Sequence, residues 1–151
     1  MAASKTRAKA PPRKRARSVQ APTFVVGLGG SAGGLDAFEQ FFASTLADTG
    51  MAFVVVTHQA PDHKALLPEL LRMTTAMPVR LAEDGLRLAR DTIYVIPPDR
   101  LLTLEGDVLR VRTSSKARGL RSPIDAFLVS LALARGTTAI GVILSGMGAD
   151  G

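Results

Sequence analysis

The sequence predicts an α/β protein built on a doubly wound, mainly parallel sheet, with helices on both faces and a short antiparallel hairpin. Three observations favour this class. Apolar runs typical of buried strands alternate with segments of helical periodicity, and the first such strand leads directly into a glycine-rich turn. In addition, 46% of the 151 residues are hydrophobic, which suffices for the core of about one domain.

Residues 1–21 are expected to form a disordered basic tail, and residues 22–151 a single domain. The tail has almost no large apolar side chain and no acidic residue, but it has seven basic ones: Lys5, Arg7, Lys9, Arg13, Lys14, Arg15 and Arg17. Such a segment cannot bury enough apolar surface to order itself. Of the 19 basic residues, 12 then remain beside 13 acidic ones, so the domain itself is close to neutral.

The composition also bears on location and on metal binding. The tail lacks the apolar centre of a secretory signal, and no segment reaches the roughly 18 uninterrupted apolar residues of a membrane-spanning helix. We therefore expect a soluble, cytoplasmic protein without membrane insertion. The chain has no cysteine, so neither a disulfide nor a thiolate metal site is expected.

The domain begins with a pattern typical of a parallel strand–helix–strand unit. One strand is predicted over residues 23–28, and a second, buried on both faces, over residues 51–56. Between them, five apolar residues recur at helical spacing and predict an amphipathic helix that ends near Gly50: Leu35, Phe38, Phe41, Phe42 and Leu46. Two parallel strands joined in this way form a right-handed unit.

The middle of the chain changes to shorter elements. Asp62 is a candidate N-cap for a helix whose apolar residues extend from Leu66 to Met73. Short strands are predicted over residues 78–81, 92–96, 101–104 and 108–112, and the last two form a hairpin around a Glu-Gly-Asp turn. Because these strands are short, we expect them at an edge of the sheet or in an antiparallel insertion.

The last third of the chain returns to longer elements. Residues 114–121 carry Lys116, Arg118 and Arg121, which indicates either a solvated basic loop or a contact for an acidic partner. Pro123 favours the start of a helix that ends near Arg135. A further strand of the buried type is predicted over residues 139–144, before a glycine-rich stretch that ends the sequence.

Ser31 is the first candidate functional residue. It stands in the pattern Gly29-Gly30-Ser31-Ala32-Gly33, where glycines permit a cramped strand-to-helix turn that presents the serine hydroxyl. Backbone N–H groups of the following helix would point to the space beside this hydroxyl and could hold an oxyanion. Two other readings remain open, because glycine-rich turns also bind phosphate or simply allow close packing.

Two further candidates follow other predicted strands. His58 comes after the second strand and Asp150 after the last one, and working groups in open α/β sheets lie beyond the carboxyl ends of strands. A histidine at a strand end is often a structural hydrogen-bonding group. Together, however, a serine, a histidine and an aspartate are the groups that a nucleophilic triad requires.

Six motifs together resemble the catalytic domain of the chemotaxis protein-glutamate methylesterases: GLGGSAGG, VTHQAPDHKALLPELL, AEDG, YVIPPDR, SPIDAF and GVILSGMGADG. The resemblance extends from about Phe24 to the last residue, and the set is far more specific than any one glycine pattern. It is nearest to the subgroup fused to a receptor methyltransferase.

The resemblance implies an enzyme that hydrolyses γ-glutamyl methyl esters on methylated chemoreceptors, releases methanol and, in some members, deamidates glutamine. By motif match, Ser31 would be the nucleophile, His58 the general acid/base and Asp150 the orienting carboxylate. Backbone N–H groups near Ala32 and Met147 would form the oxyanion hole. Neither a cofactor nor a metal is implied, and a methyltransferase is a candidate partner.

Four features depart from the family pattern. Ala32 replaces the threonine that is usual in members with a response-regulator domain. No receiver domain precedes the catalytic part, and the basic tail resembles neither a receiver nor its linker. The family domain continues beyond the aspartate loop, so the chain is expected to be truncated at its C-terminus, marginally stable and poorly active.

Three other functions remain as alternatives. A dinucleotide-binding domain would need an acidic residue at the end of the second strand, where this chain has Thr57-His58. An inactive fragment would act at most by binding a receptor or partner chain. Sequence-blind binding of nucleic acid through the basic tail is a third alternative, which predicts a strong dependence on salt.

Overall fold

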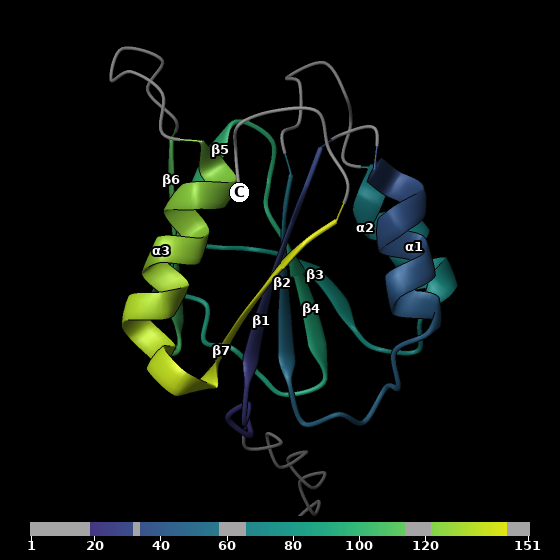
Figure 1. Ribbon diagram of the computed structural model, residues 1–151, viewed down its shortest axis with the longest axis horizontal. Helices are drawn as coiled ribbons and strands as arrows, with labels where there is room; N and C mark the ends of the chain where they lie inside the picture. The colour runs from purple at the N-terminus through teal and green to yellow at the C-terminus, as the bar shows by residue number, and fades with distance from the viewer. Residues whose placement is uncertain (1–18, 32–33, 58–65, 114–121, 145–151) are drawn as a thin grey trace, which may run out of the picture.

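The computed structural model describes residues 19–31, 34–57, 66–113 and 122–144 (Figure 1). A five-stranded parallel sheet has the order β3-β4-β2-β1-β7, and a separate antiparallel hairpin pairs β5 with β6. The elements are β1 (Val25–Gly30), α1 (Leu35–Ala43), β2 (Ala52–Thr57), α2 (Leu66–Thr74), β3 (Val79–Leu81), β4 (Thr92–Val95), β5 (Arg100–Glu105), β6 (Val108–Thr113), α3 (Pro123–Arg135) and β7 (Ala139–Ile143), with a 3-10 turn, η2, at Gly136–Thr138. The predicted fold class is confirmed.

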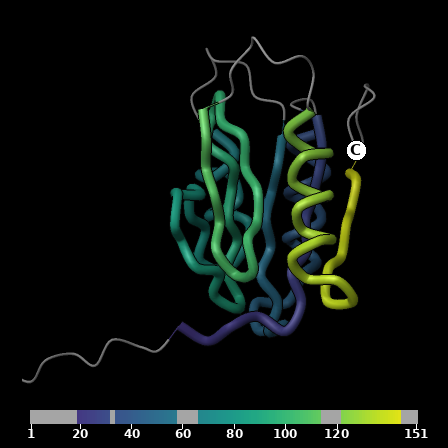
Figure 2. The backbone as a smooth tube through the Cα atoms, turned by 90° about the vertical axis from the view of Figure 1, so that its left-hand side faces the viewer, coloured from purple at the N-terminus to yellow at the C-terminus, as the bar shows by residue number. Residues whose placement is uncertain are grey.

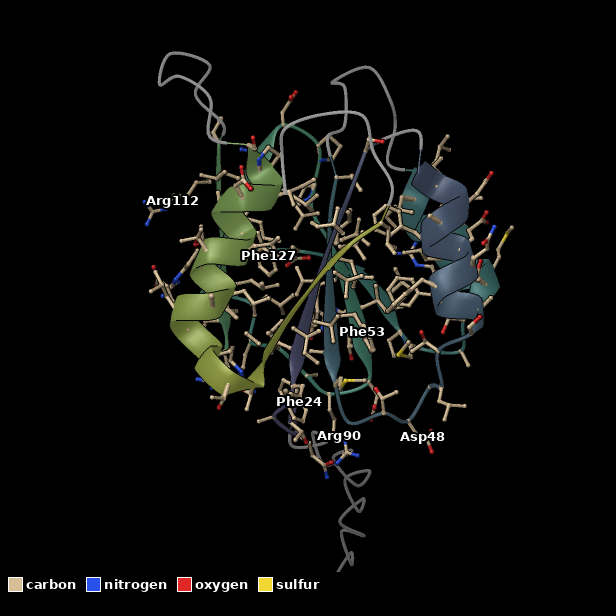
Figure 3. All side chains as sticks on the ribbon, in the orientation of Figure 1. Phe24, Asp48, Phe53, Arg90, Arg112 and Phe127 are labelled. Atoms are coloured by element: carbon tan, nitrogen blue, oxygen red, sulfur yellow. The ribbon has the colours of Figure 1, made fainter. Side chains whose placement is uncertain are left out.

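The sheet separates two layers of apolar core. Helices α1 and α2 cover one face, and α3 covers the other together with the hairpin (Figures 1 and 2). Strands β1 and β2 are buried at every residue because they pair on both sides and are covered on both faces. Figure 3 shows the fully buried Phe127 between α3 and the sheet, on the face of the sheet that the hairpin also covers.

Aromatic side chains pack between α1 and the sheet. Under α1, the rings of Phe41, Phe42 and Phe53 pack edge to face, with centroids 5.1 Å apart for the first pair and 5.5 Å for Phe42 and Phe53. Helix α1 ends at Ala43, so Leu46 lies beyond it and is 73% exposed, contrary to its predicted place on the apolar face. Hydrogen bonds from Ser44 and Thr45 back to the helix close this end.

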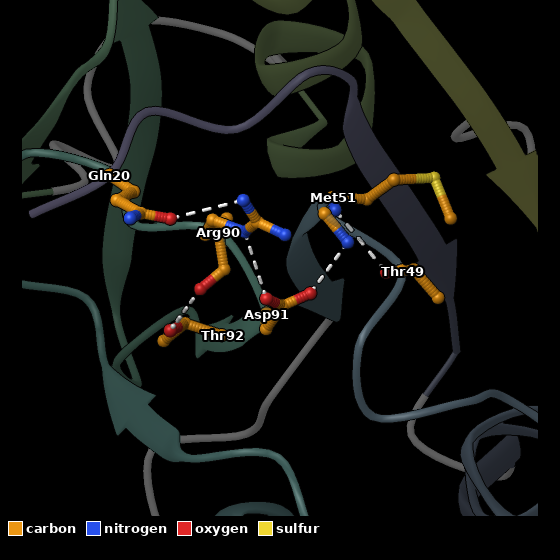
Figure 4. Close-up of polar contacts among 7 residues, drawn as sticks. Gln20, Thr49, Met51, Arg90, Asp91 and Thr92 are labelled. Carbon is orange, nitrogen blue, oxygen red and sulfur yellow. Dashed lines mark hydrogen bonds and ion pairs between the residues drawn. The ribbon is translucent and has the colours of Figure 1, made fainter.

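The segment that leads into β1 is anchored at the amino edge of the sheet (Figure 4). Arg90 donates to the side chain of Gln20 at 3.0 Å and to the carboxylate of Asp91 at 3.1 Å. Asp91 has a positive φ of 55° and also accepts from the Gly50 N–H at 2.6 Å. The start of β1 is thus tied to the loops before β2 and β4.

A second polar cluster joins α3 to the hairpin and to β1. Arg135, in the last turn of α3, forms an ion pair of 2.5 Å with Asp107 in the hairpin turn. The same guanidinium donates to the carbonyl oxygens of Pro22 at 2.9 Å and Thr23 at 3.2 Å. These bonds, with the Leu104 N–H donating to the Ser130 hydroxyl at 3.0 Å, keep the hairpin against the helix.

The prediction that all short strands lie at an edge or in an insertion is correct for β3 and for the hairpin but wrong for β4. All four residues of β4 are buried, and the strand pairs in parallel with β2 on one side and β3 on the other. The short length of β4 suggested an edge position, but hydrogen bonds to backbone outside the paired strand residues extend its pairing. The Ile96 N–H donates to the Val55 carbonyl oxygen, and the Ile93 N–H donates to the Pro78 carbonyl oxygen.

The prediction that the last strand is of the buried type is also wrong within the described residues. Strand β7 pairs there only with β1, and three of its five residues are exposed. Its apolar composition led to the error, because composition does not reveal which strand lies at an edge.

Candidate active site

Ser31 follows directly on β1, at the carboxyl edge of the sheet. Its strand lies between β2 and β7, and the serine is partly exposed. The Ser31 carbonyl accepts a hydrogen bond of 2.9 Å from the Gly34 N–H, which turns the chain so that α1 begins at Leu35. The predicted strand, tight turn and helix therefore meet at this serine, and the strand extends two residues farther than predicted.

The glycines before Ser31 are required by packing. A Cβ atom added to Gly30 would lie 2.8 Å from Cζ of Phe38 and 2.9 Å from the backbone oxygen of Leu144. A Cβ atom added to Gly29 would overlap the side chain of Ile124 in α3. The interpretation that these glycines allow close packing is therefore correct for Gly29 and Gly30. Ser31, which follows them, is partly exposed.

The neighbours of β1 bring two other strand ends to the same edge. In the parallel register Gly30 pairs with Thr57, the last residue of β2, which is buried. On the other side the Leu144 N–H donates to the Gly29 carbonyl at 2.8 Å and extends the pairing of β7. The carboxyl ends of β1, β2 and β7 therefore lie side by side.

The other predicted site residues lie outside the described residues. His58 follows Thr57 in the chain, and Met147 and Asp150 belong to the segment that follows Leu144. Ala32 is the residue after Ser31 and is likewise not described. The strands that lead to His58 and Asp150 flank the strand that leads to Ser31, but contacts within the triad stay a prediction.

The surroundings of Ser31 have distinct electrostatic features. Helix α1 begins at Leu35, four residues after Ser31. The free N–H groups at a helix N-terminus favour negative charge nearby.

Two possible features are not found in the part of the chain that the structure describes. No group of three or more His, Cys, Asp or Glu residues there could hold a metal ion. None of the described helices is long and apolar enough to cross a membrane.

Comparison with known proteins is consistent with this arrangement. The family model described as CheB methylesterase matches residues 26–151. The crystal structure of the Thermotoga maritima CheB methylesterase catalytic domain superposes with a TM-score of 0.72 at 28% sequence identity, covering 85% of this chain and 70% of that one.

Curated relatives agree over part of their length. A protein-glutamate methylesterase/protein-glutamine glutaminase of Geobacter metallireducens is 32% identical over 128 residues, which cover 83% of this chain and 37% of the relative. An uncharacterized 104.1 kDa protein of Rhodobacter capsulatus is 46% identical over 85 residues, 56% of this chain and 9% of that protein. The chain spans little more than a third of the methylesterase relative. Since the family model covers most of the chain, the chain belongs to the CheB methylesterase family.

Proposed function

We propose that residues 22–151 belong to the catalytic domain of a protein-glutamate methylesterase that hydrolyses γ-glutamyl methyl esters on chemoreceptors. The observation that carries the proposal is the position of Ser31, partly exposed at the carboxyl end of the inner strand β1 within a G-x-S-x-G pattern. Membership in the CheB methylesterase family supplies the reaction class.

In the proposed reaction, the Ser31 hydroxyl attacks the ester carbonyl while His58 takes its proton. Asp150 orients the imidazole and stabilises its charged form. The tetrahedral oxyanion is held by backbone N–H groups near Ala32 and Met147, and it collapses as His58 returns the proton to the departing methanol. Water, deprotonated by His58, then cleaves the γ-glutamyl ester on Ser31 and releases a glutamate side chain.

The same steps would release ammonia from a glutamine side chain, since an amide carbonyl accepts the same nucleophile. Relatives whose names include protein-glutamine glutaminase support this second activity. We infer that no cofactor or metal takes part in the reaction and that the protein works in the cytoplasm. The basic tail of residues 1–21 is not part of the proposed catalytic domain.

We also propose that the catalytic domain is part of a larger protein that includes a receptor methyltransferase. The methyltransferase is suggested by the motif resemblance, and the 46% identical match to an uncharacterized 104.1 kDa relative, of which the match covers only 9%, supports only the larger size. A methyltransferase in the same protein would create the esters that this domain removes.

The decisive experiment measures methanol release from a methyl-esterified chemoreceptor. The wild-type chain should release methanol, and Ser31→Ala should lower the rate by on the order of 10⁴-fold or more, since the nucleophile is lost. Ser44→Ala is the matched control: Ser44 is exposed at the end of α1 and should leave the rate unchanged.

Two results would contradict the proposal. Equal rates in wild-type and Ser31→Ala protein would remove Ser31 as nucleophile. Receptor binding without methanol release, from a chain that melts cooperatively, would instead support a binding module without activity.

A further inference from the structure

One buried hydroxyl group lies next to the residue that precedes Ser31. Thr57, the last residue of β2, is 4% exposed, and the other residues of this strand are apolar. Among the described serines and threonines, only Thr57 and Thr92 are buried. Burying a hydroxyl group costs free energy unless it is hydrogen-bonded, and Thr57 is not without an interaction partner. Its hydroxyl is therefore expected to hold a neighbouring part of the chain in place.

The register of the sheet places Thr57 beside the strand end that leads to Ser31. Strands β1 and β2 are neighbours, and Thr57 pairs with Gly30 (Figure 1). In the chain, Ser31 and His58 each follow directly on one member of this pair. Val55 belongs to the core beneath α1 and α2, and the alternation of side chains along a strand puts Thr57 on the same face. Thr57 thus lies where this core layer reaches the carboxyl edge.

The start of helix α1 packs against the Gly30 member of this pair. A Cβ atom added to Gly30 would lie 2.8 Å from Cζ of Phe38, the fourth residue of the helix. The N-cap of α1 is Gly34, which supplies no side-chain hydrogen bond to the free N–H groups of the first turn. A threonine hydroxyl both donates and accepts hydrogen bonds, so it suits backbone groups of either kind in this turn.

The core layer around Thr57 offers its hydroxyl no other buried polar side chain among the described residues. Leu28 and Val55 form the preceding pair on the same face, and both are fully buried. The second buried threonine, Thr92, starts β4 and pairs with Ala52, at the opposite edge of the sheet. Backbone groups within the sheet are already paired between strands. The groups that suit the Thr57 hydroxyl therefore belong to backbone that leaves the sheet at the carboxyl edge.

We propose that Thr57 is a positioning residue for the reaction, and that its buried hydroxyl fixes the backbone turn that presents Ser31. The inference rests on the proposed function. Thr57 acts through Ser31 and not by contact with the substrate. A nucleophile must be held close to the reactive geometry, and a displacement of about 1 Å can lower the rate on the order of a hundredfold. One hydrogen bond beneath the turn thus affects the rate more than it affects the stability of the fold.

The kinetics of methanol release from a methyl-esterified chemoreceptor test this role. Thr57→Val keeps the shape of the side chain and removes only the hydroxyl, so it should lower kcat about ten- to a hundredfold and leave KM unchanged. Thr57→Ser retains the hydroxyl and should restore most of kcat. An unchanged kcat in Thr57→Val, or a kcat in Thr57→Ser as low as in the valine variant, would overturn the positioning role.

Thr92→Val is the matched control, because it removes a buried hydroxyl far from Ser31. The Thr92 hydroxyl donates to the Arg90 carbonyl oxygen at 3.1 Å, at the amino edge of the sheet (Figure 4). Thr57→Val and Thr92→Val should lower the melting temperature by similar amounts, roughly 2–6 °C, for one lost hydrogen bond each. Only Thr57→Val should lower kcat. Equal losses of kcat in both variants would assign the effect to stability and would overturn the proposal.

Hydrogen exchange separates this proposal from the proposed function, because it requires no turnover. In Thr57→Val the amides of residues 31–35 should exchange about fivefold faster than in wild type, whereas Thr57→Ser and Thr92→Val should leave their exchange unchanged. A chain that shows this pattern but hydrolyses no ester would refute the esterase and keep the contact of Thr57 with the turn. Hydrolysis that depends on Ser31, with neither a lower kcat nor faster exchange in Thr57→Val, would do the reverse.

Discussion

Gly30 occupies a position where three elements of the structure converge. It is the last residue of β1, with Phe38 of α1 above it and the backbone of Leu144 beside it. The space for a side chain is therefore closed on one side by backbone, which cannot move aside as a flexible side chain can. The residue before the candidate nucleophile is limited to glycine by its surroundings.

We expect Gly30→Ala to lower the free energy of unfolding by about 1–3 kcal/mol, the cost typical of overpacking. Gly141→Ala is the matched control, since its Cβ atom would meet Leu128 at 3.6 Å, an ordinary contact. That variant should be neutral or slightly more stable, because alanine loses less backbone entropy than glycine. Urea unfolding of both variants tests the difference, and equal stabilities would show that β1 and α1 adapt without cost.

Strand β4 stabilises the segment before it through a buried phenol. Tyr94 is fully buried, and its hydroxyl accepts a hydrogen bond of 2.8 Å from the Ala89 N–H. Burial raises the pKa of the Tyr94 phenol above its usual value of about 10, and the bond from Ala89 opposes this change in part. The folded chain thus favours the neutral phenol.

The raised pKa of Tyr94 predicts how stability changes at alkaline pH. Below pH 10 the phenol is neutral in both states, and its contribution is fully present. Above that pH the unfolded phenol loses its proton first, so the free energy of unfolding falls by about 1.4 kcal/mol per pH unit until the folded phenol ionises as well. Tyr94→Phe should lack this alkaline loss, and it should be less stable than wild type at neutral pH by about 1 kcal/mol, for the lost hydrogen bond.

Absorbance provides a direct measurement, because Tyr94 is the only tyrosine and the chain has no tryptophan. The phenolate band should appear at higher pH in the folded chain than in the same chain in urea. Coincident titration curves would contradict the raised pKa.

At the level of elements, local patterns predicted strands and helices better than they predicted neighbours. The hairpin and α3 follow from turn residues and from Pro123, which act within a few residues. The inner place of β4 depends on pairing with β2, some forty residues away in the sequence. A strand's composition does not encode such a partner, which explains the two wrong assignments at β4 and β7.

At the level of the whole molecule, the sequence placed Ser31 correctly because a single local turn positions it. The closeness of the ends of β2 and β7 to Ser31 follows from the sheet order, which emerges only when the chain folds. Long-range packing therefore decides what surrounds the candidate nucleophile.

The two edges of the described sheet differ in a way that predicts how the chain associates. Strand β3 has three residues and presents the charged Arg80, whereas β7 has five residues and no charged side chain. Short or charged edges resist pairing with other chains, and longer apolar edges invite it. The chain should therefore associate as its concentration rises, through β7.

Two substitutions of nearly equal exposure test this prediction. Ile140 on β7 is 38% exposed and Leu81 on β3 is 39% exposed. Ile140→Lys should shift the sedimentation profile toward the monomer, because a lysine on the edge strand opposes pairing, whereas Leu81→Lys should leave association unchanged. A wild-type chain that stays monomeric at every concentration, or an equal effect of both lysines, would show that the β7 edge does not drive association.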